Sequence, residues 1–219
     1  MKTEGPDIDE QRRVKMVIVK KSNGQPVVDV SREVNGTFEP NMRTGRQVAG
    51  FWPDQFHMKL AAEGRERVKI GRRTFDCTTR KYRVKEPKQG IFRELKLWHA
   101  PDVTLPYREI IVDQGANVAL DSDIVRAKYT VKLGNRTTSY DLRIMSLSRR
   151  MRVADKMLEC VVERCRAEVK DPDQPSTVNS ERWLSQLVPG HVVKMEGTAK
   201  IDGAEIRKIE TVESFDTRP

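Results

Sequence analysis

The chain has 219 residues, of which 37% are hydrophobic and 33% charged, a composition typical of globular proteins with a polar surface. No window approaches the roughly 18 consecutive apolar residues of a membrane-spanning helix, and three cysteines are too few for a disulfide scaffold. The net charge of +9 favours an anionic partner such as nucleic acid, anionic lipid or an acidic protein. Because 32 acidic residues are scattered among 41 basic ones, a solvated surface of mixed sign is the alternative.

Residues 1–13 are polar and predict an N-terminal tail. They contain no apolar segment of the kind that a signal peptide needs. A cytoplasmic protein and the mature form of an exported protein both fit this beginning.

Alternating apolar and polar residues dominate the chain after this tail and predict strands. Residues 14–34 read as a hairpin with its turn at Asn23-Gly24, the dipeptide most typical of tight hairpin turns. Residues 125–146 read as a second hairpin, in which Ala127 and Tyr129 share an apolar face and Lys128 lies on the other.

An insertion at 36–64 separates the first hairpin from the next strand. Its string "FWPDQFHMKLAAEG" predicts a helix over 53–63, because Pro53 suits a first turn and Gly64 suits a stop. Phe56 and Leu60 are four residues apart and would share one face of that helix. We expect it to cover the apolar face of the sheet.

The two hairpins begin two similar series of elements. In each series a strand with a central cysteine is followed by a strand with a tryptophan, a proline and a return strand. The first series consists of 14–34, 73–84, 91–99 and 107–113, with Pro106, and the second of 125–146, 156–169, 181–187 and 191–196, with Pro189. We therefore predict a mainly β fold, an antiparallel curved sheet built from two similar halves, 14–122 and 123–219, with one main helix inserted in the first half.

No pattern of catalytic or metal-binding residues is found in the sequence. Cys160 and Cys165 are five apart on a predicted strand and would point to opposite faces. Cys77 and Cys160 each lie among apolar neighbours, as buried free cysteines usually do. We predict no metal, no cofactor and no enzymatic activity.

Aromatic and aliphatic side chains offer the best candidate site. Trp98 and Trp183 either anchor their strands in the core or line an apolar cavity. Around the insertion, a ligand pocket and a filled core are again the alternatives. The predicted ligand-binding set is Phe51, Trp52, Phe56, Leu60, Trp98 and Trp183.

The string "LWHAPDVTLPYREIIVDQG" resembles a pattern in the LolA/LolB-type carriers, which sort bacterial outer-membrane lipoproteins. The matching positions are Leu97, Trp98, Leu105, Pro106, Arg108 to Val112 and Gly115, and in the second series Trp183, Val188, Pro189, Val192, Val193 and Gly197. The resemblance implies an antiparallel sheet curled around a helix, with an apolar concave face that accepts lipid chains. It also implies a periplasmic or cell-envelope location.

These observations favour a non-enzymatic carrier or binding protein for an apolar or amphiphilic ligand, such as a lipid or lipoprotein. The alternatives are a basic β module that binds nucleic acid or another anionic polymer, and a structural component of the cell envelope. The second function requires basic residues such as Arg126, Lys128 and Lys132 to form one stripe with exposed aromatic side chains between them. The oligomeric state does not follow from the sequence.

Overall fold

The computed structural model describes residues 8–11, 14–22, 25–34, 37–44, 53, 56–86, 90–112, 116–188, 191–201 and 203–212. Most of them lie in strands, which confirms the prediction of a mainly β protein. Within these ranges, no helix has the length and apolar character that crossing a membrane requires. In chain order the strands are β1 (Ile8–Gln11), β2 (Val14–Ser22), β3 (Gln25–Val34), β4 (Thr37–Thr44), β5 (Lys59–Ile70), β6 (Arg73–Glu86), β7 (Ile91–His99), β8 (Arg108–Val112), β9 (Ala116–Leu120), β10 (Ile124–Leu133), β11 (Arg136–Val153), β12 (Lys156–Lys170), β13 (Ser176–Leu184), β14 (Val192–Ile201) and β15 (Ala204–Thr211).

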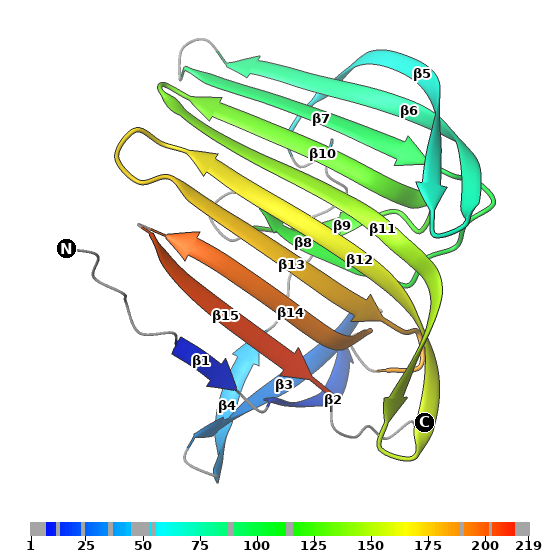
Figure 1. The fold of residues 1–219 in the computed structure, drawn as a ribbon, viewed down its shortest axis with the longest axis vertical. Helices are drawn as coiled ribbons and strands as arrows, with labels where there is room; N and C mark the ends of the chain where they lie inside the picture. The colour runs from blue at the N-terminus through cyan, green and yellow to red at the C-terminus, as the bar shows by residue number, and fades with distance from the viewer. Residues whose placement is uncertain are drawn as a thin grey trace.

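The described strands form three sheets (Figure 1). The large sheet has ten strands in the order β1-β15-β14-β13-β12-β11-β10-β7-β6-β5. Its strands from β15 to β5 are antiparallel to their neighbours, and β1 joins the edge parallel to β15. A three-stranded sheet holds β2, β3 and β4, and β8 pairs with β9 in a two-stranded ribbon.

Both predicted hairpins are confirmed by strand pairing. β2 pairs with β3, and β10 pairs with β11 across the turn at Gly134, whose positive φ of 57° suits glycine. The predicted alternation also holds: Ala127 and Tyr129 are buried and Lys128 between them is exposed. The second hairpin therefore presents one face to the core and one to solvent.

The prediction of one curved sheet built from both halves is wrong for residues 14–34. β2 and β3 pair with β4, which comes from the predicted insertion, in the separate three-stranded sheet. The position beside β6 is taken by β5, so no edge of β6 is left for the hairpin. Backbone pairing, which alternation within a strand does not specify, decides this arrangement.

The predicted helix over 53–63 is wrong from Phe56 onward, because Phe56 and His57 form a turn and Lys59 begins β5. Pairing with β6 satisfies the backbone groups of β5 in place of helical hydrogen bonds. Gly64 is not a helix stop but lies within the strand, where an added Cβ would come to 3.2 Å from Thr79 Oγ1. Pro53 is helical, and residues 54 and 55 lie outside the described ranges.

Three clusters of buried side chains make up the described core. The first centres on Tyr129 and Leu142, the second on Trp98 and Ile144, and the third on Cys160. β5 contacts β11 although β6, β7 and β10 separate them in the sheet, so the sheet coils upon itself at this end. This coiling gives a single sheet enough depth to bury side chains.

Replacing Leu142 with alanine should test this core. Leu142 has no exposed surface, and such a deletion costs about 2–5 kcal/mol of unfolding free energy. Leu133, on the same hairpin but 53% exposed, is the matched control, and Leu133→Ala should change stability by less than about 0.5 kcal/mol. Urea unfolding measures both, and equal losses would contradict the assigned faces.

Candidate functional site

Basic side chains line up across the outward face of the large sheet. Residues paired on adjacent strands point to the same side. Lys81 on β6 pairs with Lys96 on β7, which pairs with Lys128 on β10, and the line continues through Asp141 on β11 to Arg166 on β12. We call these five residues row one.

A second line runs beside row one, two residues along the strands. Trp98 on β7 pairs with Arg126 on β10, and the line continues through Arg143 on β11 and Arg164 on β12 to Glu181 on β13. We call these residues row two. The seven cations of the two rows form the basic band.

The ion pairs of this face leave an excess of positive charge. Asp141 alone serves three cations, Arg126, Lys128 and Arg143. Counting the neighbours of the band, nine cations share five carboxylates: Lys81, Arg83, Lys96, Arg126, Lys128, Arg143, Arg164, Arg166 and Lys170 with Glu66, Glu94, Asp141, Glu168 and Glu181.

The carboxylate of Asp141 stays ionised in this setting. Its partial burial alone would raise its pKa, but hydrogen bonds from Arg143 and Arg126 outweigh burial and lower it. Partly exposed ion pairs of this kind contribute only about 0–1 kcal/mol each. An incoming anion could therefore replace these carboxylates at little cost.

Trp98 and Trp183 hold cations over their rings. Lys96 Nζ and Arg126 Cζ each lie 4.7 Å from the Trp98 ring centroid, and Arg149 Cζ lies 4.7 Å from that of Trp183. The Trp98 side chain is buried and donates its Nε1–H to Glu66 at 2.7 Å. It therefore positions two cations of the basic band.

Both tryptophans occupy the same position relative to a cysteine. Two residues after Cys77, Thr79 pairs with Trp98, and two residues after Cys160, Val162 pairs with Trp183. Each strand pair also follows a two-residue turn, Gly71-Arg72 before β6 and Ala154-Asp155 before β12.

The other predicted ligand-binding residues lie apart from these tryptophans. Phe56 packs against the first core cluster, with its ring stacked on Tyr129 at 5.8 Å between centroids. Leu60, at the start of β5, is 51% exposed. Trp98 belongs to the second cluster and Trp183 packs against the third, so the structure does not bring these side chains to one cavity. Residues 51 and 52 lie outside the described ranges.

A buried ion pair joins the β8–β9 ribbon to the large sheet. Arg108 on β8 and Glu163 on β12 have side chains without exposed surface, and Arg108 Nη1 donates to Glu163 Oε2 at 2.9 Å. Arg182 Nε donates to the other oxygen at 2.9 Å. Burial alone would raise the pKa of Glu163, but the two guanidinium groups outweigh burial and lower it.

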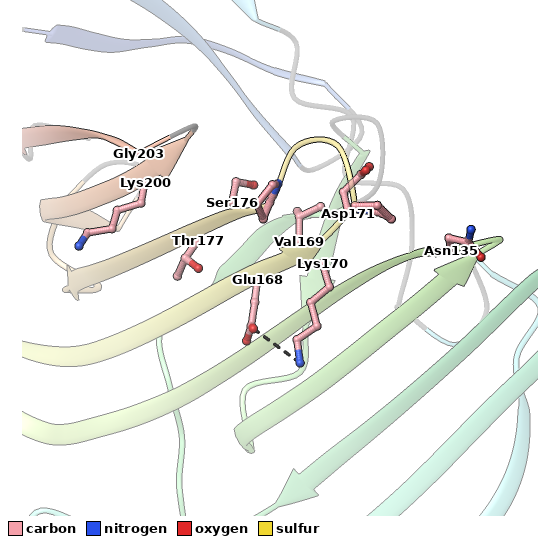
Figure 2. Close-up of a pocket in the computed structure, with 11 residues that line it drawn as sticks. Asn135, Glu168, Val169, Lys170, Asp171, Ser176, Thr177, Lys200 and Gly203 are labelled. Carbon is pink, nitrogen blue, oxygen red and sulfur yellow. Dashed lines mark ion pairs between the residues drawn. The ribbon is translucent and has the colours of Figure 1, made fainter. Parts of the chain in front are cut away.

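Two open pockets on the large sheet are lined mainly by residues with polar or charged side chains. One, of about 440 Å³, lies at the strand ends near Asn135 and Gly203, where Figure 2 shows Lys170 paired with Glu168. The other, of about 370 Å³, lies above Gly197 and is bordered by Arg164. Glu181, Glu196 and Glu205 also line the second pocket, so the excess of positive charge does not extend through it toward β15.

His99, Asp121 and Asp123 form a cluster whose candidate ligand atoms lie within 4.8 Å of one another. Sequence spacing missed it, because the loop between β9 and β10 brings the two aspartates to the end of β7. A divalent cation could be held here. The hydrogen-bonding contact of His99 Nδ1 with Asp123, at 3.2 Å, accounts for their proximity without an ion.

The cysteines behave as packing residues. Cys77 and Cys160 are buried, as the sequence predicted, and burial raises the pKa of both thiols. Burial also raises the pKa of Cys165 to about 11. All three are therefore protonated at neutral pH, which makes them poor nucleophiles.

No family model, curated protein or solved structure matches this chain.

Glu163→Gln should strongly destabilise the protein. Removing one partner of a buried ion pair leaves uncompensated charge and costs about 3–5 kcal/mol. Glu181→Gln is the matched control, because Glu181 pairs with Arg164 at the surface and such pairs contribute about 0–1 kcal/mol. Chemical denaturation measures both losses, and equal losses would contradict the role of Glu163.

The stability that Glu163 contributes should also depend on pH. Its pKa is lower in the folded protein than the ordinary 4.5, so the contribution is fully present above pH 4.5. It is lost as the pH falls through the folded-state pKa. The difference in unfolding free energy between wild type and Glu163→Gln should therefore shrink below that pH. A difference that stayed constant down to acid unfolding would contradict this linkage.

Proposed function

We propose that this protein is a non-enzymatic binding protein that holds an anionic partner on the outward face of its large sheet. The observation that carries the proposal is the excess of cations in and around the basic band, where one carboxylate, Asp141, serves three cations. Opposite charges speed association and favour the correct partner. This function also uses the charge of +9 that the sequence carries.

The weakness of the surface ion pairs supports this function. A phosphate or sulfate group can accept charge-assisted hydrogen bonds from the same guanidinium groups that now face Asp141. The cations are already gathered by register and, at Trp98, by ring contacts, so little ordering is needed on binding. Asp141 occupies the place that the partner's anion would take.

We also propose that the two tryptophan strands descend from a duplicated unit. Support comes from the shared register of each tryptophan with the residue two after a cysteine. In this proposal the repeated units are β5 to β7 and β11 to β13, and the hairpin at 14–34 lies outside them.

A second candidate function is the carriage of an apolar or amphiphilic ligand in the cell envelope. Its support is the apolar edge at the start of β5, where Phe56 is half-buried and Leu60 exposed. Acyl chains could extend the contacts that Phe56 already makes with Tyr129.

Asp141→Asn should strengthen binding of an anionic polymer by about three- to tenfold, because one surface charge at about 4 Å contributes about 1 kcal/mol. Asp76→Asn is the control, since Asp76 is 90% exposed and pairs with Arg67 away from the band. Isothermal titration calorimetry with heparin at low salt measures the affinity of both variants. Equal gains in both variants would show that only net charge matters.

Phe56→Ala tests the second function. If Phe56 lines a ligand pocket, the variant should lose little stability and release a bound fluorescent fatty acid. If Phe56 fills the core, the variant should lose about 3–5 kcal/mol of unfolding free energy. Leu133→Ala, which removes an exposed apolar side chain on another strand, controls for surface hydrophobicity. A large stability loss without any change in fatty-acid retention would rule out the carrier.

A further inference from the structure

We propose that the anionic partner is a linear polyanion that lies across the strands, along the basic band, and is held by its phosphate or sulfate groups alone. This inference rests on the proposed function and adds the form and the orientation of the partner. It follows from the direction of the two rows, their borders and the position of Trp98.

The two rows run perpendicular to the strands. Neighbouring strands lie about 4.8 Å apart, so row one, which crosses five strands from Lys81 to Arg166, is about 19 Å long. Rows two residues apart are separated by about 7 Å. A chain laid across the strands meets at least one cation on each of these five strands, with Arg143 of row two taking this part on β11 beside Asp141. A chain laid along β10 meets only Arg126 and Lys128 before leaving the band.

Carboxylates and neutral residues make up most of the line that borders row one. In register, that line contains Arg83 on β6, then Glu94, Thr130, Ser139 and Glu168. Row two ends at Glu181 on β13, which pairs with Glu196 on β14. Figure 1 shows these two strands side by side. A narrow track with such borders fits a linear polymer, while an anionic membrane favours a broad basic surface.

The burial of Trp98 excludes recognition of bases by stacking on this ring within the band. Its side chain is 3% exposed and lies beneath Lys96 and Arg126. Proteins that bind single-stranded nucleic acid by its bases present exposed aromatic rings. The band therefore offers charges only, so its binding should be independent of sequence and strongly weakened by salt.

The test compares two variants with the same change of net charge. Lys128→Glu with Arg166→Glu reverses two charges inside row one, and both side chains are about half-exposed or more. Lys132→Glu with Arg136→Glu reverses two exposed charges on either side of the turn between β10 and β11, outside the band. Thermal melts confirm folding, and Lys128→Gln with Arg166→Gln replaces the first pair if the reversal prevents folding.

Fluorescence anisotropy with a labelled oligothymidine and a labelled heparin oligosaccharide measures binding across a salt series. We expect wild type to bind at least one probe, and the band variant to bind at least about tenfold more weakly. Its log–log salt slope should be shallower by about 1.4, at about 0.7 for each lost phosphate contact. The control should change binding by less than about threefold. The preferred probe tells phosphate from sulfate chains.

Three other outcomes would overturn the inference. An equal loss of affinity in the control variant would show that binding depends on net charge alone. Preference for vesicles of anionic lipid over both linear probes would assign the face to a membrane surface. Either result leaves the proposed anion-binding function standing. Failure of wild type to bind any of these probes at low salt would remove that function as well.

Discussion

Glu163 is a carboxylate without solvent contact near the middle of β12, and it depends on two cations for its stability there. Arg182 comes from the neighbouring strand, whereas Arg108 comes from the β8–β9 ribbon and also donates to the backbone oxygen of Ile124. Separating the ribbon from the sheet would leave Glu163 with Arg182 but without Arg108, and breaking a buried ion pair in this way costs several kcal/mol. This contact therefore fixes which side of the large sheet is covered and which is open to solvent.

The two sides of the sheet consequently differ in chemistry. The covered side is filled by aliphatic and aromatic side chains, such as Leu97, Tyr129 and Leu142, and it also holds the buried ion pair of Arg108 with Glu163. The open side carries ion pairs that are individually weak and exchangeable. Binding by exchange of these partners needs no enclosed cavity, which agrees with the open pockets found on this sheet.

The tryptophans connect the two sides. Trp98 is buried, yet its ring lies under two cations of the open face and its N–H bonds to Glu66. Trp183 repeats the arrangement with exchanged signs, since Arg149 takes the strand position of Glu66 and Glu181 that of Lys96. The recurrence of tryptophan was visible in the sequence, but the exchange of charges around it was not, because Glu66 and Arg149 come from β5 and β11, each two strands away from the tryptophan in the sheet.

By itself, the sequence predicted strands at the places of β2, β3, β6 to β8 and β10 to β14, both hairpins and the burial of Cys77 and Cys160, since alternation and turn residues act over a few neighbours. Only the tertiary structure decided that Lys59 begins a strand instead of continuing a helix, because pairing with β6 overrides local helix signals. It also decided the basic band and the partners of Glu163. Those depend on register between strands far apart in the chain, and a shift of one residue would turn every side chain to the opposite face.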